Sequence, residues 1–408
     1  MDNGAKIVHV CLCGATTDGF SYQENLLAKY HRKMGYAVTL IASQWINDTS
    51  GGLTTTAKTD YRNGDDVKVV RIPMIFGTID TRLKIYPEII SVIEKETPDI
   101  LFVHACQFLD IVRIASFLKT HPGVRCYVDN HADYSNSASG WLSRNVLHRV
   151  IWRFCAGRIE PYVRYFYGVM PARVDFLREL YGLPEEKCRL LVMGADDELA
   201  EAAGAKERVE RTRAEYGIVA QDFLIVTGGK IDAWKPQTLL LMKAVQKLQA
   251  ESSKVAEHQA SDRSVYMPRN IRLLVFGSVV KELREQFDAL VDGTVVQYLG
   301  WQDNEAGYRL LAAADLAVFP GRHSVYWEQT AGLGIPMVVK DWEGTHHVDL
   351  GGNVRFLRED SEEEIRGVLK EIVEKPGVYA AMKKAAQEKG PKVFRYSRIA
   401  AESIESTT

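Results

Sequence analysis

Short apolar runs alternate with amphipathic stretches over the first half of the chain. The runs predict buried strands, and apolar residues spaced three and four apart predict helices. The expected strands are 6–12, 37–42, 67–72, 100–104, 125–129 and 188–193, and the expected helices are 22–33, 86–96, 110–119 and 173–181. This alternation is typical of a parallel sheet with covering helices.

A second series of the same kind follows residue 206. Its expected strands are 223–226, 271–276, 295–299, 316–319 and 337–340, and its expected helices are 237–248, 281–290 and 305–314. The acidic, alanine-rich segment 194–206 predicts a linker, and segments 44–61 and 251–264 predict a surface loop and an exposed insertion. A chain of 408 residues is long enough for two α/β domains.

Composition and charge narrow the class of protein. The net charge of -2 at pH 7 provides no general basic field, so we expect no nucleic-acid partner. The six cysteines lie mostly in apolar runs and predict reduced, buried thiols. Neither a signal peptide nor a long apolar window is apparent, so we expect a cytoplasmic protein.

The turn after strand 223–226 carries the first candidate chemistry. It reads Gly228-Gly229-Lys230, followed by Lys235 and by the predicted helix 237–248. The glycines allow close approach to the backbone, while the helix start and the lysines offer N–H groups and positive charge. These features suit a diphosphate. An ordinary β–α turn with solvated lysines accounts for the same residues equally well.

Two further loops follow predicted strands. The segment after the first strand, 13–25, is rich in glycine and hydroxyl groups and opens a helix, which makes it a second anion-tolerant turn. The segment 320–336 follows strand 316–319 and places Glu328 and Gln329 on a short predicted helix. In open parallel sheets such loops surround the ligand.

Together these features resemble the retaining GT-B glycosyltransferases of the GT4-like group 1 family. The resemblance spans almost the whole chain and rests on the two halves, on G-G-K-x4-K, and on A-A-A-D-L-A-V-F-P followed by E-Q-x-A-G-x-G-I-P. It implies an α/β GT-B fold, with two Rossmann-like domains facing each other across a cleft. The implied parts are an acceptor domain at 1–195, a donor domain at 196–385, and a helix within 386–408 that returns to the first domain.

The resemblance implies donor-binding roles in the second half. Gly229, Lys230 and Lys235 would hold the donor diphosphate, with Lys235 also acting in catalysis. Glu328 would contact the donor ribose as the second glutamate of the family's pair and is, like Lys235, a catalytic candidate. Counting back from Gly334-Ile335-Pro336 places Gln329 at that position equally well.

The sequence departs from the family at the first glutamate of that pair. Pro320 lies eight residues before Glu328, and the nearest polar candidates for contact with the sugar are His323 and Ser324. The identity of the donor sugar is therefore left open.

The first half supplies the remaining candidates. Gly19 resembles the glycine that lets the loop approach the diphosphate, and His131 stands where relatives have an active-site histidine. A histidine there could bind the reacting sugar or move a proton near neutral pH. A structural loop histidine is the alternative. Asp133 and Tyr134 are candidates for acceptor contact, with capping and packing as equal alternatives.

The implied function is transfer of a sugar, as in a hexosyltransferase, from a UDP- or GDP-sugar to a glycan or lipid-linked acceptor in cell-surface polysaccharide or glycoconjugate synthesis. Lys230, Lys235 and the helix start would stabilise the leaving diphosphate, with no cofactor and no metal, in keeping with the missing Asp-x-Asp motif. A sugar-nucleotide epimerase or hydrolase of the same shape, and a non-catalytic sugar-binding protein, are the alternatives.

Segment 141–167 is basic and aromatic. Leu147, Val150, Ile151 and Phe154 fall at helical spacing and predict one apolar face, while Arg149 and Arg153 flank Trp152. This combination suits an anionic membrane surface, which would place the protein at the inner face of the cell membrane. A helix packed on the core with a solvated basic edge is the alternative.

Overall fold

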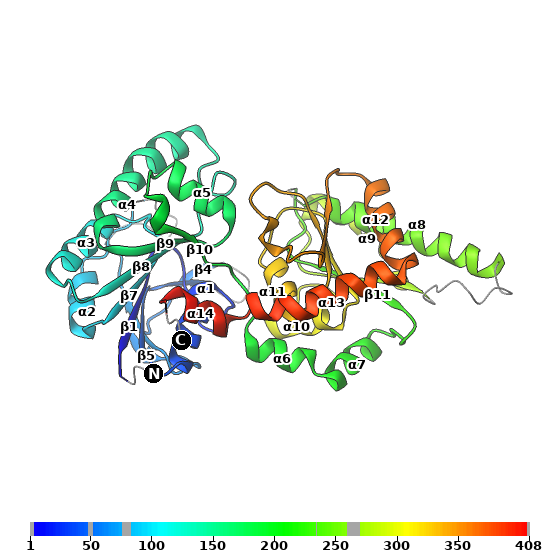
Figure 1. The fold of residues 1–408 in the computed structure, drawn as a ribbon, viewed down its shortest axis with the longest axis horizontal. Helices are drawn as coiled ribbons and strands as arrows, with labels where there is room; N and C mark the ends of the chain where they lie inside the picture. Colours follow the sequence, from blue (N-terminus) through cyan, green and yellow to red (C-terminus); the bar gives the residue numbers. More distant parts are fainter. Residues whose placement is uncertain (1–3, 48–51, 76–82, 234, 259–269, 406–408) are drawn as a thin grey trace. The chain divides into compact units, whose positions relative to one another are not determined.

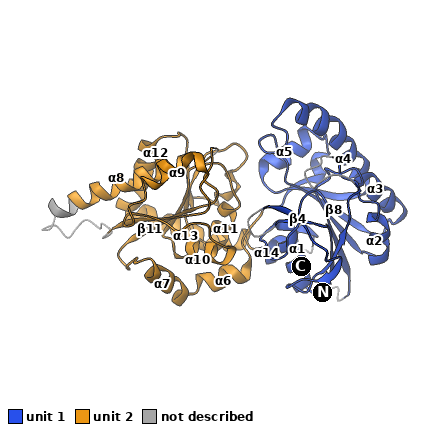
Figure 2. Cartoon of the chain, turned by 180° about the vertical axis from the view of Figure 1, so that it is seen from behind, with its two compact units in different colours: residues 1–192, 396–408 blue, residues 193–395 orange. Residues whose placement is uncertain are grey.

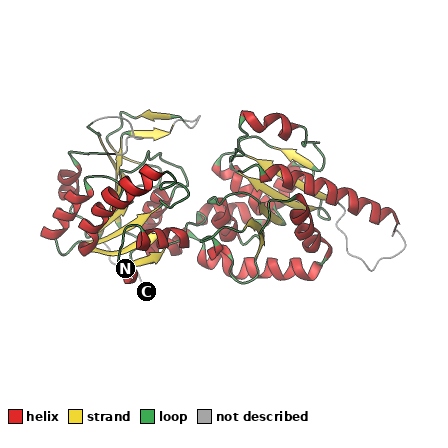
Figure 3. Ribbon diagram, turned by 90° about the horizontal axis from the view of Figure 1, so that it is seen from above, coloured by secondary structure: helices red, strands yellow, loops and turns green. Residues whose placement is uncertain are grey.

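The computed structural model describes residues 4–47, 52–75, 83–233, 235–258 and 270–405. The chain forms two compact units, one of residues 1–192 with 396–408 and the other of residues 193–395 (Figure 2). Each unit has its own sheet with helices against it (Figure 3). The division after residue 395 means that the expected boundary at 386 falls inside helix α13 (Pro376–Val393), and that α14 (Tyr396–Ser403) belongs to the first unit.

The first unit contains an eight-stranded sheet in the order β10-β9-β8-β7-β1-β2-β6-β5. Its strands are β1 Lys6–Cys11, β2 Ala37–Ser43, β5 Asp60–Arg62, β6 Lys68–Ile72, β7 Ile100–His104, β8 Arg125–Asn130, β9 Val163–Gly168 and β10 Cys188–Leu190. β5 pairs antiparallel with β6, and the other pairings are parallel. The predicted strands of the first half are confirmed.

Helices cover both faces of this sheet (Figure 1). One face carries α2 Ile89–Glu96, α3 Ile111–Thr120 and α4 Arg153–Ile159, and the other carries α1 Gln23–Lys33 and α14. α5 Pro171–Glu179 connects β9 to β10. Because both faces are covered, β7 is buried along its whole length, as expected for a central parallel strand.

The second unit contains a six-stranded parallel sheet in the order β13-β12-β11-β14-β15-β16. Its strands are β11 Phe223–Gly228, β12 Ile271–Phe276, β13 Val296–Tyr298, β14 Leu316–Phe319, β15 Met337–Lys340 and β16 Val354–Leu357. α8 Gln237–His258, α9 Lys281–Asp288 and α12 Glu362–Glu374 cover one face, and α10 Asn304–Ala313 and α11 Tyr326–Leu333 cover the other (Figure 1). β12, β14 and β15 have the predicted bounds.

Three predictions about irregular segments were wrong. The predicted linker 194–206 contains helix α6 (Asp197–Gly204), because the side chain of Asp196 accepts a hydrogen bond from Glu198 N and caps it. The predicted loop 44–61 contains β5 and a small hairpin of β3 (Trp45–Asn47) with β4 (Leu53–Thr55), although its residues 48–51 lie outside the described part. Within the predicted insertion, α8 continues to His258, and residues 259–264 lie outside the described part.

Segment 141–167 forms the π-helix η1 (Ser143–Trp152), then α4, a short turn and β9. The predicted single apolar face is wrong. Leu147 and Ile151 pack against the core, whereas Val150 and Phe154 are 60% and 59% exposed. Trp152, predicted between two arginines at a surface, is buried.

The six cysteines are unpaired, as predicted. Burial raises the pKa of Cys11 and raises that of Cys13 to about 12. The two thiols are therefore protonated near neutral pH and are poor nucleophiles.

Candidate functional site

Three loops of the second unit follow the carboxyl ends of adjacent parallel strands. The strands β11, β14 and β15 are neighbours in the sheet, so the loops after them leave the same edge. Ligands of open parallel sheets bind at this edge. The loops contain most of the candidate residues of the second half.

Gly228 and Gly229 bring the end of β11 close to β12. A Cβ atom on Gly228 would lie 2.1 Å from the ring of Phe276, so no other residue fits there without a shift. Gly229 has φ +116, which favours glycine, and its N–H donates to Phe276 O at 3.1 Å. A Cβ on Gly229 would meet Tyr326 at 3.6 Å and Lys235 Nζ at 3.9 Å, so this turn lies beside both side chains.

Lys235 is half-buried at the edge of the sheet. Burial lowers its pKa, Asp232 opposes that shift, and the positive charge of Arg322 adds to it. A bound anion would reverse the lowering, because it favours the ammonium form. Lys230, in contrast, has a side chain that is 65% exposed and lies 3.9 Å from Asp232.

The start of α8 lies next to Lys235. The Lys235 N–H donates to Asp232 O at 2.9 Å, which folds the turn that leads into the helix. A Cβ on Gly321, in the loop after β14, would lie 3.2 Å from Lys235 Cγ and 3.3 Å from Gln237 Oε1. The start of a helix of 22 residues and the ammonium group of Lys235 thus lie together, an arrangement that suits an anion.

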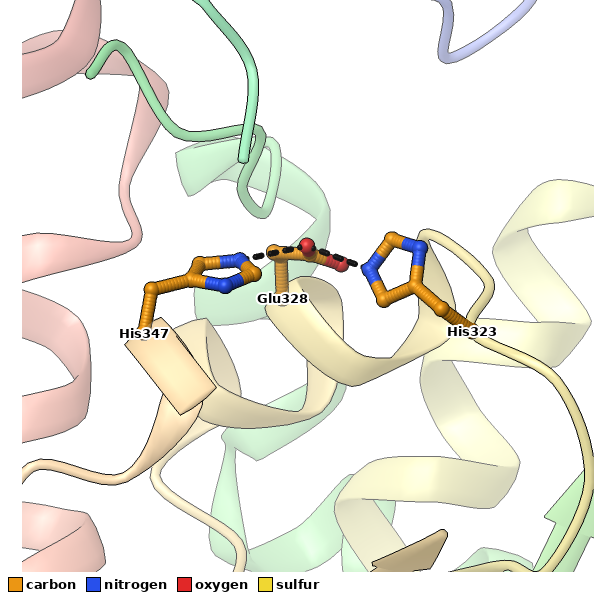
Figure 4. Close-up of side chains that lie close together, drawn as sticks. All are labelled: His323, Glu328 and His347. Carbon is orange, nitrogen blue, oxygen red and sulfur yellow. Dashed lines mark hydrogen bonds and ion pairs between the residues drawn. The ribbon is translucent and has the colours of Figure 1, made fainter. Parts of the chain in front are cut away.

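Glu328 is fully buried on α11 between two histidines (Figure 4). His323 Nε2 lies 2.7 Å from Glu328 Oε1, and His347 Nε2 lies 2.9 Å from the same oxygen. Because an ionised carboxylate only accepts hydrogen bonds, both rings donate to it. His323 comes from the loop after β14, and His347 comes from the loop after β15.

The two histidines keep Glu328 ionised. Burial alone would raise its pKa, but the charge and hydrogen bonds of His323 and His347 outweigh burial, and the pKa is well below its usual range. Among the described residues, these three form the group that could hold a metal ion. Two imidazoles and a carboxylate are a donor set that zinc accepts.

Several buried polar atoms around α11 have no hydrogen-bond partner among the described residues. They are Trp327 Nε1, Glu328 Oε2, Gln329 Oε1, Thr330 Oγ1 and His347 Nδ1. Native proteins leave few such atoms unpaired, so the gathering of five on and beside one helix favours a polar ligand or ordered water there. Ser324 lies two residues before this helix, and its carbonyl accepts a hydrogen bond from Trp327 N at 3.0 Å.

Sequence reasoning missed His347. The available signal was the His346-His347 pair six residues after β15, in a loop that leaves the same edge as the other two. The sequence alone does not show that His347, rather than His346, turns toward Glu328.

In the first unit, Gly19 lies in the loop after β1 with φ +77, a conformation that favours glycine. Among the described residues, nothing lies within 4 Å of a Cβ placed on it. Neighbours hold the rest of the loop: Asn25 Nδ2 donates to Thr17 O at 2.7 Å, and Tyr61 OH donates to Asp18 Oδ2 at 2.7 Å. Gly19 is therefore an exposed backbone position on an anchored loop.

His131 follows β8, and 38% of its side chain is exposed. Its Nε2 lies 3.7 Å from Oδ2 of Asp129, which is completely buried at the end of the strand. The loops that carry Gly19 and His131 leave the same edge of the sheet, because β1 and β8 both run parallel to β7. The structure thus provides an accessible imidazole beside a buried carboxylate.

Asp133 and Tyr134 are held by contacts inside the first unit. Asp133 Oδ1 accepts from Ser135 N at 2.7 Å, and its Oδ2 lies 3.1 Å from Arg173 Nε. Tyr134 OH donates to Glu179 at 3.2 Å. The predicted contact of these two residues with an acceptor stays a prediction.

Comparison with protein-family profiles gives no match, and comparison with curated protein sequences gives none either. Solved structures do match. Anabaena Alr3699/HepE in complex with UDP superposes with a TM-score of 0.67 at 15% identity, covering 98% of this chain and 100% of that one. Sucrose-phosphate synthase from Thermosynechococcus elongatus gives 0.64 at 13% identity, covering 97% of each chain.

An epimerase matches as well. UDP-GlcNAc 2-epimerase from Neisseria meningitidis, bound to UDP-GlcNAc, gives a TM-score of 0.59 at 12% identity and covers 98% of this chain and 100% of that one. At such identities the likeness establishes the fold. With its two parallel-sheet units and full coverage by these structures, the chain has the α/β GT-B fold, built from two Rossmann-like domains.

Proposed function

We propose that the protein is a glycosyltransferase that moves a sugar from a UDP- or GDP-sugar to a glycan or lipid-linked acceptor. The observation that carries the proposal is the grouping of Gly229, half-buried Lys235 and the start of α8 at the edge of the second sheet, which we call the candidate anion site. A structure of the same fold, HepE, binds UDP. A diphosphate bound at this edge of the sheet suits both the grouping of Lys235 with the start of α8 and the binding of UDP by HepE.

Lys235 is the proposed stabiliser of the leaving group. Negative charge grows on the diphosphate as the bond to the sugar breaks, and a fixed ammonium group with a helix start nearby stabilises that charge. Lys230 is exposed and would add a weaker, screened attraction. We propose that transfer needs neither metal nor cofactor, with retention of the anomeric configuration as the family resemblance implies.

The proposed ribose and sugar contacts lie on and before α11. Glu328 Oε2 is the carboxylate oxygen left free by the two histidines, and Gln329 Oε1 is the amide oxygen on the next residue. Both are acceptors that hydroxyl groups of a nucleotide sugar could satisfy. His323 and Ser324 stay candidates for the sugar, and His131 stays the candidate for proton transfer in the first unit.

The acceptor side of the proposal includes contact with a membrane. Trp141, Leu142, Val146, Val150 and Phe154 are exposed large apolar residues that line η1 and α4, and we call them the apolar ridge. Arg149 and Arg153 are exposed beside it. Apolar and basic side chains in one surface suit a bilayer with anionic lipids. In the described part of the chain, no helix is long and apolar enough to cross a bilayer.

The competing function is epimerisation or hydrolysis of a sugar nucleotide, which the match to the Neisseria epimerase favours. Incubation with UDP- and GDP-sugars in the presence and absence of lipid-linked acceptors separates the two. Turnover that needs the acceptor supports transfer. Equal turnover without the acceptor supports the epimerase or hydrolase.

A further inference from the structure

Three buried histidines of the first unit form a continuous hydrogen-bonded chain. His104 Nε2 lies 2.9 Å from His9 Nδ1, and His9 Nε2 lies 3.0 Å from His31 Nδ1. The three rings come from β7, β1 and α1, and each is at most 4% exposed. Both contacts are nitrogen to nitrogen, so each needs one proton between the rings.

The chain ends on an acceptor on both sides. At one end, Asp129 Oδ2 lies 2.7 Å from His104 Nδ1. At the other end, the carbonyl of Ala400 on α14 lies 2.9 Å from His31 Nε2. A carboxylate and a carbonyl only accept, so each terminal contact also needs a proton on the ring. All six ring nitrogens are used.

The chain of histidines has more hydrogen-bond contacts than three neutral rings have protons. Two contacts between rings and two at the ends make four hydrogen bonds, whereas three neutral imidazoles have three N–H groups. Filling all four contacts therefore requires one ring to be an imidazolium. The buried negative charge of Asp129 beside His104 is the partner for that charge.

Ser403 allows a second state with one proton fewer. Its Oγ lies 3.0 Å from His31 Nε2 and donates to Ala400 O at 2.8 Å. If the hydroxyl turned to donate to His31 Nε2, three neutral rings, each protonated on Nδ1, would satisfy all six ring nitrogens, and the hydrogen bond from His31 Nε2 to Ala400 O would be given up. When His31 Nε2 gains a proton, the proton on His31 Nδ1 passes to His9 Nε2, the proton on His9 Nδ1 passes to His104 Nε2, and the charge arises on His104.

We propose that His104, His9 and His31 form a proton relay that couples the hydrogen bonding of Ser403 on α14 to the charge on His131. Asp129 is the link, because its Oδ2 faces both His104 and His131. When His104 is charged it neutralises Asp129, and His131 loses support for its own charge. When the relay is neutral, Asp129 stabilises His131 as an imidazolium.

The pKa shifts of the three histidines favour a positive charge on His104, the ring beside Asp129. Burial lowers the pKa of His9, and burial lowers that of His31 to about 4. Burial would also lower the pKa of His104, but Asp129 outweighs burial and raises it. Two further titratable groups lie close to the relay: Glu24 on α1 favours the charge on His104, and the ring of Tyr36 packs against His31.

Nitrogen NMR of protein labelled with 15N-histidine tests the relay, because it reports which ring nitrogens carry protons. With falling pH, His9 and His31 should change from the Nδ1–H to the Nε2–H form together, while His104 gains its second proton. Ser403→Ala removes the donor of the neutral state, so this change should move up by about half to one pH unit, and the ring-nitrogen signals of His131, which faces the same Asp129 oxygen, should change with it. Ser91→Ala is the matched control, since Ser91 also donates to a carbonyl three residues back.

His9→Phe breaks the relay in the middle, so in that background Ser403→Ala should leave His131 unchanged. The proposal is overturned if His9 and His31 keep one tautomer between about pH 5 and 8, or if Ser403→Ala behaves like Ser91→Ala. Ser403→Ala should also change the pH profile of sugar transfer if His131 acts in catalysis. That expectation rests on the proposed glycosyl transfer, whereas the NMR result does not. The NMR experiment therefore tests the relay independently of the proposed glycosyl transfer.

Discussion

At the scale of single residues, the position of Lys235 separates it from the other lysines of its region. It is half-buried beside Gly229 and the start of α8, whereas Lys230 is exposed. Desolvation strengthens the attraction between an ammonium group and an anion, while water screens an exposed lysine. We therefore assign the larger share of diphosphate binding to Lys235.

Replacing Lys235 with alanine is expected to weaken UDP binding roughly 10- to 100-fold, the cost of one hydrogen bond to a charged group. Isothermal titration at constant ionic strength measures this. Lys243→Ala is the matched control, because Lys243 is exposed further along α8. Equal affinities of wild type and Lys235→Ala for UDP would show that Lys235 does not bind the diphosphate.

Glu328 is expected to contribute to stability through its two histidine partners. Glu328→Gln should lower the free energy of unfolding by about 2 kcal/mol at pH 7. Because the folded pKa of Glu328 is depressed, this contribution is present above the unfolded value of about 4.3 and is lost as the pH falls through the folded pKa.

Urea unfolding of both proteins at several pH values measures that difference. Glu363→Gln, on an exposed position of α12, should change stability little at any of them. A Glu328→Gln protein as stable as wild type at pH 7 would show that the carboxylate is not needed for the fold.

Some residues of the candidate sites could be predicted from the sequence, and others could not. Lys235, Glu328 and His323 could be proposed because they lie in segments that follow predicted strands. His347 and the relay of His9, His31 and His104 could not. His347 meets Glu328 only after folding, and the three histidines of the relay come from three separate elements. A single histidine within a predicted strand is interpreted as a core residue, because the sequence does not show which side chains lie beside it after folding.

At the scale of elements, strands were predicted well and irregular segments poorly. β12, β14 and β15 are short apolar runs buried in a parallel sheet, and such runs have few alternatives. The linker prediction at 194–206 failed because alanine and glutamate favour a helix when a cap such as Asp196 is present. In η1, the wider π-helix spacing separates residues that an α-helical pattern places on one face.

The apolar ridge on η1 and α4 is expected to bind vesicles that contain anionic lipid. Replacing Trp141 and Phe154 with serine should reduce co-sedimentation about tenfold, because two large exposed side chains are lost from the contact. Trp301→Ser is the control, since Trp301 is 70% exposed in the other unit. Wild-type protein that stays in the supernatant with such vesicles would contradict membrane contact.

At the scale of the whole molecule, the GT-B fold brings together two units built on the same plan. The edge of each sheet carries its own candidate groups, with Gly19 and His131 in the first unit and the candidate anion site in the second. The sequence predicted this division into two α/β halves from the repeated alternation of strands and helices. The pattern holds no information on the nucleotide base, the sugar or the acceptor.

Chelation tests the proposal that catalysis needs no metal. Activity should be unchanged after dialysis against EDTA, because the lysine and the helix start supply the positive charge. Metal analysis of the purified protein addresses the His323, Glu328 and His347 group directly. Loss of activity with EDTA, followed by recovery on addition of a divalent cation, would contradict the metal-free mechanism.

The most direct test of the account is transfer of radiolabelled sugar from a panel of UDP- and GDP-sugars to lipid-linked acceptors, with wild type and Lys235→Ala compared. We expect one donor to give labelled acceptor with wild type, and little or no labelled acceptor with the variant. Label released without an acceptor, or equal transfer by both proteins, would contradict the proposed glycosyl transfer at the Lys235 site.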